Sequence, residues 1–272
     1  MRLILALAGC FAGLACFAVA AASPATRVVS LDYCADQYVL ELLPRAHVLA
    51  LSPDAEQEYA YLRERAAGLP KVRPVAEDVI ALAPGLVIRS YGGGPQALGF
   101  FERAGIPVVQ VPYAETLDDV RAAVRAVADG LGVPVRGAAV VAEMQARLNA
   151  VAGAVDDVRS RPAALYLTAG GAAGGPGTLI DEVLAAAGYA NYESRPGWHM
   201  LSLERLVRAE PDVVVASFFE GATGMTAYWS AVRHPVARRR LEDRPVIALP
   251  GALTACGAWF VADAVEILAG AR

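Results

Sequence analysis

Short apolar runs along the chain stand between longer segments in which apolar positions recur with helical spacing. Each run is too short for a helix and suits a buried strand. We expect strands at residues 27–31, 48–51, 108–111, 164–168 and 246–249. We expect helices between and after them, at residues 35–43, 96–104, 116–131, 178–187 and 258–268. Strands that alternate with helices in this way predict an α/β fold with parallel sheets.

A twelve-residue pattern occurs twice in the chain, at residues 77–88 and 204–215. In each copy a Glu opens a helical turn, a Pro stands seven residues later, and an apolar run follows. Proline disfavours helical backbone at the preceding residue, so each helix should end before it and a strand should follow. The repeat predicts two similar α/β lobes with a ligand cleft between them.

A long helical pattern separates the two copies and covers about residues 135–158. Its apolar positions have spacings of 4, 4, 3, 4 and 3, which form one helix face. They are Val140, Met144, Leu148, Val151, Val155 and Val158. Such a helix would be roughly 35 Å long at 1.5 Å per residue. We interpret it as a rigid strut between lobes, with an ordinary sheet-covering helix as the alternative.

These patterns predict an N-terminal lobe over residues 23–133, a linking helix over 134–160 and a C-terminal lobe over 161–272. Met1 and Arg2 precede an almost uninterrupted apolar run that ends in three alanines before Ser23. A positive charge, an apolar stretch and an A-x-A site are typical of a secretory signal peptide, here residues 1–22. A retained membrane anchor and a lipoprotein attached through Cys10 stay open as alternatives.

Export would place the mature chain in an oxidising compartment, where Cys34 and Cys256 remain. They could form a disulfide between the lobes, stay free, or contact a ligand. A bridge would hold the lobes at a fixed separation, which argues against it if the lobes close on a ligand.

Several function classes receive little support. The net charge is −4 and no basic stripe exists, so nucleic-acid binding is not expected. The Gly-rich segment 169–177 lacks a nucleotide-loop pattern, and we expect a mobile loop at the rim of a cleft. The three histidines, His47, His199 and His234, are too scattered to predict a metal site. Neither a nucleophile elbow nor a zinc-protease motif is present.

Aromatic residues cluster in the loops expected after strands. They are Tyr33, Tyr91, Trp198 and Trp229. Ligands bind at the carboxyl ends of strands in open α/β sheets, and aromatic faces there suit a large, partly apolar ligand. Packing of each ring within the fold is the alternative.

Several segments together resemble the periplasmic substrate-binding proteins of ABC importers for vitamin B12 and ferric siderophores. The resemblance covers about residues 26–270. It rests on 27–31, 77–88, 104–108, 178–188 with Asn191, and 202–215. It implies two Rossmann-like lobes joined by one long helix, a periplasmic location, and delivery of a ligand to an inner-membrane permease.

The resemblance also assigns residues. It implies that Glu77 and Glu204 dock against Arg residues of the permease, although each Glu would also stabilise a helix N-terminus. Trp198 stands six residues before Glu204, the spacing of a ligand-contacting Trp in the vitamin B12-binding member. Arg89 and Arg195 suit an anionic ferric siderophore equally well.

We therefore expect a ligand that is a ferric siderophore or a corrinoid, with haem third. The expected ligand-binding residues are Tyr33, Cys34, Arg89, Tyr91, Arg195, Trp198 and Trp229. The expected protein is a monomer without catalytic residues, resident metal or cofactor. An exported two-lobed α/β enzyme is the rival class.

Overall fold

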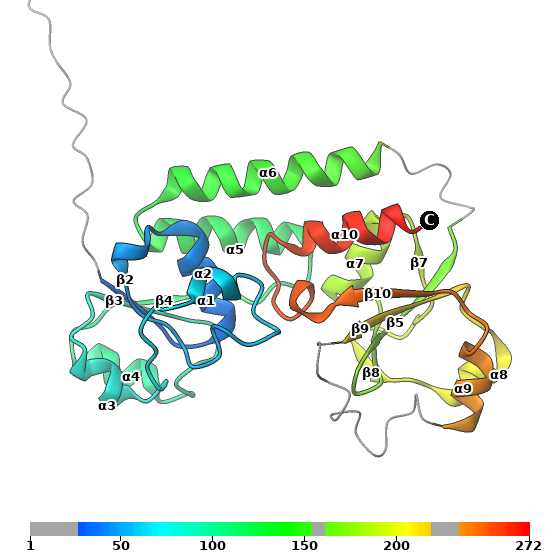
Figure 1. Ribbon diagram of the computed structural model, residues 1–272, viewed down its shortest axis with the longest axis horizontal. Coiled ribbons are helices and arrows are strands. Elements are labelled where there is room, and N and C mark those ends of the chain that lie inside the picture. Colours follow the sequence, from blue (N-terminus) through cyan, green and yellow to red (C-terminus); the bar gives the residue numbers. More distant parts are fainter. Residues whose placement is uncertain (1–26, 154–160, 219–233) are drawn as a thin grey trace, which may run out of the picture.

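The computed structural model describes residues 27–153, 161–218 and 234–272 (Figure 1). Two α/β lobes are each built on a parallel four-stranded sheet, with strand orders β2-β1-β3-β4 and β10-β9-β5-β7. The expected α/β fold with parallel sheets and two lobes is confirmed. Residues 1–22, where we expect a signal peptide, lie outside the described residues. Among the described helices, none is long and apolar enough to span a membrane.

The N-terminal lobe alternates strands and helices as the pattern predicts. Asp32 accepts a hydrogen bond from the N–H of Ala35 and so caps the first helix. The elements are β1 (Val28–Ser30), α1 (Tyr33–Leu42), η1 (Arg45–His47), β2 (Val48–Ala50), α2 (Arg63–Ala66), α3 (Ala76–Ala81), β3 (Leu86–Arg89), α4 (Ala97–Arg103), β4 (Val108–Gln110) and α5 (Leu117–Gly130).

The C-terminal lobe follows the same scheme and adds a small antiparallel sheet. Its elements are β5 (Ala163–Thr168), β6 (Ala172–Gly174), α7 (Leu179–Ala186), β7 (Ala190–Asn191), β8 (Trp198–Met200), α8 (Leu203–Arg208), β9 (Val213–Phe218), α9 (Pro235–Leu241), β10 (Val246–Pro250), η5 (Gly251–Leu253) and α10 (Val261–Gly270). The prediction of a mobile loop at residues 169–177 is wrong in part, because β6 lies within this segment and pairs with β8.

The two copies of the repeat build equivalent parts of the lobes. Each forms a short helix, α3 or α8, that ends three residues before its Pro and leads into an inner strand, β3 or β9. In the first copy, Ala83 precedes Pro84 with φ of 47°, the left-handed conformation that usually falls to Gly after a helix. The backbone is therefore strained at this position.

The linking helix α6 (Pro134–Ala152) runs along one edge of the molecule and crosses both lobes (Figure 1). Val140 and Val141 belong to the core around α1, whereas Met144 and Leu148 belong to the core around α7 and α10. At 19 residues the helix is about 28 Å long. It ends before the expected Val158, with Gly153 after it, and Val155 and Val158 lie outside the described residues. The lobe boundaries themselves remain a prediction.

Candidate ligand-binding site

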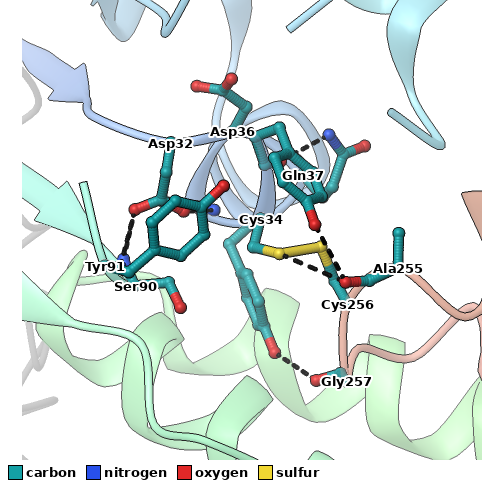
Figure 2. Close-up of a disulfide and its surroundings, with 12 residues drawn as sticks. Asp32, Cys34, Asp36, Gln37, Ser90, Tyr91, Ala255, Cys256 and Gly257 are labelled. Carbon is teal, nitrogen blue, oxygen red and sulfur yellow. Dashed lines mark hydrogen bonds between the residues drawn. A yellow bond between two sulfur atoms is a disulfide. The ribbon is translucent and has the colours of Figure 1, made fainter. Parts of the chain in front are cut away.

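Asp32 organises the carboxyl end of the N-terminal sheet. One carboxylate oxygen caps α1, and the other accepts hydrogen bonds from the backbone N–H groups of Ser90 at 2.7 Å, Tyr91 at 3.0 Å and Gly92 at 2.9 Å. The side chain is only 2 % exposed, so hydrogen bonds from four backbone N–H groups replace those that water would make to the carboxylate. Asp32 therefore joins the start of α1 to the loop after β3 (Figure 2).

Gly92 in this loop is needed for steric reasons. A Cβ built on Gly92 would lie 2.3 Å from the carbonyl oxygen of Leu31, a distance that no side chain tolerates. The backbone of the loop can therefore approach the end of β1 closely only with Gly at this position.

Three tyrosines from separate segments meet beside this loop. The ring of Tyr33 lies edge-on to Tyr59, with centroids 4.8 Å apart, and edge-on to Tyr91 at 6.0 Å. Tyr91 is 54 % exposed as a whole residue and is more exposed than Tyr33 and Tyr59, which are half-buried. Burial raises the pKa of Tyr33 and Tyr91, and it raises the pKa of Tyr59 to about 12, so all three phenols are neutral at pH 7. We refer to Tyr33, Tyr59 and Tyr91 as the tyrosine cluster.

The sequence indicated two of these three rings. Tyr33 and Tyr91 follow strands, as expected for residues that contact a ligand. Tyr59 was missed because it lies in the irregular segment between β2 and α2, where no strand end marks it.

Cys34 and Cys256 form a disulfide, which is one of the three alternatives that the sequence left open. The bridge joins the first turn of α1 to the segment after η5 in the other lobe (Figure 2). The bridge forms although we argued against it, and it excludes a free thiol at Cys34. Contact of Cys34 with a ligand stays a prediction. The sulfur of Cys34 is bonded to Cys256, and both residues are more than 90 % buried.

Arg89 ends β3 and is only 6 % exposed. Its Nη2 donates to the carbonyl oxygen of Tyr91 at 3.1 Å. Its Nε and Nη1 have no hydrogen-bond acceptor among the described residues. A buried guanidinium with unused donors is costly, so this position favours an anionic partner.

The other expected ligand residues belong to the C-terminal lobe. Trp198 lies in β8, is 46 % exposed, and sits edge-on to Tyr166 with centroids 6.1 Å apart. Arg195 is paired with the buried Glu193, Nη2 to Oε2 at 2.9 Å, and this contact helps lower the pKa of Glu193 to about 2. Arg195 is thus already engaged within its own lobe. Trp229 lies outside the described residues.

Glu77 and Glu204 are both exposed, in the first turns of α3 and α8. These helices lie on the side of the molecule away from α6, one in each lobe (Figure 1). Two hydrogen bonds lower the pKa of Glu204. The larger effect comes from its own backbone N–H and the smaller one from the hydroxyl of Ser202. Two carboxylates on one side of a two-lobed molecule can contact a single broad partner.

Metal-binding side chains do not converge in the part of the chain that the structure describes. No group of three His, Cys, Asp or Glu residues there has the arrangement of a metal site. His199 instead places Nε2 2.7 Å from the carbonyl oxygen of Pro196.

The sequence model of a family described as periplasmic binding protein matches residues 28–224. The chain belongs to this family of periplasmic binding proteins. The match includes both copies of the repeat and the helix between them, so the resemblance seen in the sequence is confirmed.

Among known relatives of this periplasmic binding protein are the cobalamin-binding proteins of two Halobacterium salinarum strains. Each is 31 % identical over 227 residues, which is 78 % of this chain and 60 % of the relative. The chain therefore spans less than two thirds of the length of these relatives.

Solved structures show the same fold. The haem-binding protein RhuT from Roseiflexus sp. RS-1, in its apo form, is 26 % identical with a TM-score of 0.67, over 91 % of this chain and 99 % of its own. A periplasmic binding protein from Veillonella parvula has a TM-score of 0.74 at 14 % identity, over 91 % and 90 % of the two chains. These relatives are named as binding proteins and not as enzymes.

Proposed function

We propose that this periplasmic binding protein captures a large metal-chelate ligand and delivers it to an ABC permease in the inner membrane. The ligand is a ferric siderophore or a corrinoid, with haem as the alternative. The tyrosine cluster carries this proposal, because it forms an aromatic surface at the carboxyl end of a parallel sheet, where α/β proteins bind ligands.

The chemistry of the cluster suits such a ligand. Tyrosine rings offer apolar contact area together with a hydroxyl that can donate or accept a hydrogen bond. Because the phenols are neutral, they recognise a flat or partly apolar ligand by contact and hydrogen bonds and not by charge. The exposed ring of Tyr91 is the group in the cluster most available to the ligand.

Arg89 supports a ligand that carries an anionic oxygen. Its Nη2 donates to the carbonyl oxygen of Tyr91 in the tyrosine cluster, whereas its Nε and Nη1 are buried and have no hydrogen-bond acceptor among the described residues. A carboxylate or hydroxamate oxygen reaching this position would pair with the guanidinium and remove the cost of its isolation. Arg195 is a weaker candidate since Glu193 already neutralises it.

The names of the relatives support the class of ligand. The Halobacterium proteins are named for cobalamin, and the Roseiflexus protein is named for haem. Both ligands are large metal-containing macrocycles with flat faces. A wide aromatic surface is compatible with either ligand.

Delivery to the permease would use Glu77 and Glu204. Exposed carboxylates on both lobes can pair with Arg residues of the permease, and such pairs set register and encounter rate more than affinity. We also propose that residues 1–22 direct export and are removed, with lipoprotein attachment through Cys10 as the alternative. The exported protein acts as a monomer.

A titration followed by tryptophan fluorescence tests the ligand proposal. Cyanocobalamin, haemin and a ferric hydroxamate are added in turn, and Trp198→Phe shows whether Trp198 reports the quenching. Tyr91→Ala should weaken binding of the ligand by about tenfold or more, as for a central aromatic contact. Phe100→Ala removes another exposed aromatic, on α4, and should leave binding unchanged. Equal affinities for the wild-type protein and Tyr91→Ala would contradict the proposed site.

A further inference from the structure

Three consecutive residues at the start of α1 connect three different parts of the molecule (Figure 2). Asp32 holds the backbone of the loop at residues 90–92. Tyr33 packs its ring against Tyr91. Cys34 is bonded to Cys256 of the other lobe. Because these residues are neighbours around one helix start, a displacement of any of them moves the others.

The disulfide is one of several contacts between the lobes at this point. The hydroxyl of Tyr33 donates to the carbonyl oxygen of Ala255 at 3.2 Å, and that of Tyr38 donates to Gly257 at 3.3 Å. These two acceptors flank Cys256. We call this set of contacts the interlobe seam. The seam holds the segment after η5 against α1, beside the tyrosine cluster.

A third hydrogen bond from a tyrosine hydroxyl joins the lobes farther along the chain. Tyr61 donates to Oδ2 of Asp263 in α10 at 2.6 Å, and its ring stacks on Phe260 with centroids 4.3 Å apart. This contact links the lobes without touching Asp32, Tyr33 or the loop at 90–92 in any described contact. It therefore serves as a matched control for the seam.

Tyr33 belongs to both the seam and the tyrosine cluster. Its hydroxyl reaches across to Ala255, while its ring supports the exposed ring of Tyr91. We propose that Tyr33 is a positioning residue that couples the orientation of Tyr91 to the interlobe seam, so that removal of the Cys34–Cys256 bridge weakens ligand binding. The expected loss of ligand affinity, the ligand half, rests on the proposed function. The coupling of the bridge to Tyr91 and the loop at 90–92, the structural half, does not.

The bridge restricts the conformations of Tyr33 and Tyr91 in the free protein. Ligand binding therefore does not have to restrict them. With the bridge intact, the carbonyl oxygen of Ala255 stays within reach of the Tyr33 hydroxyl and restricts the orientation of its ring. Without the bridge, the segment at 255–257 can move away and Tyr33 gains alternative positions. The ligand then has to order Tyr33 and Tyr91 on binding, which lowers its affinity.

Amide hydrogen exchange tests the structural half without any ligand. The Cys34→Ser, Cys256→Ser double variant is compared with the wild-type protein and with Tyr61→Phe. We expect exchange at Ser90, Tyr91 and Gly92 to rise by about tenfold in the double variant, within the usual range of coupling between sites. Tyr61→Phe should change these amides by less than about twofold. Faster exchange at 255–257 with unchanged exchange at 90–92 would overturn the coupling.

A second variant keeps the test valid if the double serine variant does not fold. Tyr33→Phe retains the disulfide and the ring and removes the hydroxyl, which bonds to Ala255 and interacts with the side chain of Tyr91. It should also raise exchange at 90–92, and combining it with the serine variants should add little, because both changes break one coupled unit. Additive effects of the two changes would contradict a positioning role for Tyr33.

Calorimetric titration with cyanocobalamin, haemin and a ferric hydroxamate tests the ligand half. For the probe that binds the wild-type protein, we expect the dissociation constant to rise about tenfold in the double serine variant and in Tyr33→Phe. An unchanged dissociation constant together with faster exchange at 90–92 would overturn the ligand half alone. If none of the probes binds the wild-type protein, the proposed function fails while the exchange result still decides the coupling.

Discussion

Asp36 accepts two hydrogen bonds from Ser52, one from the hydroxyl at 2.6 Å and one from the backbone N–H at 3.1 Å. The side chain is fully buried in α1, and burial raises its pKa to about 6 in spite of these bonds. A carboxyl group that holds its proton more tightly in the folded state stabilises the protein most at low pH. Its contribution is complete below about pH 4 and is lost as the pH rises through about 6.

Asp36→Asn should therefore change the pH dependence of stability. The free energy of unfolding of the wild-type protein gains about 1.4 kcal/mol from this group between pH 8 and pH 5, and the variant lacks that gain. The free energy of unfolding of the variant, relative to that of the wild type, should be highest at pH 8. Urea unfolding at both pH values measures the difference. A difference between the two proteins that is the same at pH 5 and pH 8 would contradict the raised pKa.

Asp32→Ala should destabilise the protein more than loss of a helix cap does. The variant loses the cap of α1 and leaves the N–H groups of Ser90, Tyr91 and Gly92 without their acceptor. We expect a cost on the order of 4 kcal/mol, from one cap and several unsatisfied buried donors. The control is Thr116→Ala, which removes the cap of α5 and should cost about 1 kcal/mol. Similar costs in the two variants, measured by urea unfolding, would show that Asp32 acts only as a cap.

Ala83→Gly should stabilise the protein. Ala83 has φ of 47°, and a side chain in this conformation costs roughly 1 kcal/mol that Gly does not incur. The gain is reduced by the larger entropy of Gly in the unfolded chain, so we expect about 0.5 kcal/mol in the free energy of unfolding. Ala104→Gly, after α4 in ordinary helical conformation, is the control and should destabilise. A loss of stability in Ala83→Gly equal to that of the control would be evidence against the strain.

Glu77→Ala combined with Glu204→Ala should abolish ligand transport and leave ligand affinity intact. Both side chains are exposed and have no described contact with the tyrosine cluster, so their loss removes only the carboxylates offered to the permease. Uptake of labelled ligand in cells and titration of the purified protein measure the two effects. Glu143→Ala, an exposed carboxylate on α6 at the opposite side, is the control. Normal uptake in the double variant would exclude a docking role.

The sequence predicted those parts of the fold that local rules determine. Asp32 caps α1 just before the helix that the pattern predicts, and this contact is local because an N-cap needs only a side chain three residues from its donor. Both copies of the repeat form a helix and a strand on either side of Pro, since Pro excludes helical backbone before it. The parallel sheets follow from alternation of these elements along the chain.

Contacts between distant segments could not be predicted in the same way. The bridge between Cys34 and Cys256 joins residues 222 positions apart, and no local pattern ranks it above two free thiols. The strand β6 in the Gly-rich segment exists because β8 pairs with it from beyond α7. Tyr59 enters the tyrosine cluster from the irregular segment between β2 and α2.

Thermal unfolding in the presence of candidate ligands shows whether the protein binds a large metal chelate. Cyanocobalamin, cobinamide, haemin and several ferric siderophores are each added to the purified protein. A true ligand at 100 times its dissociation constant adds about 2.7 kcal/mol to the free energy of unfolding. We predict that one chelate raises the midpoint temperature by about 5–10 °C, and that Tyr91→Ala reduces this rise. No shift with any of these chelates, or an equal shift in Tyr91→Ala, would contradict binding of a large metal chelate at the tyrosine cluster.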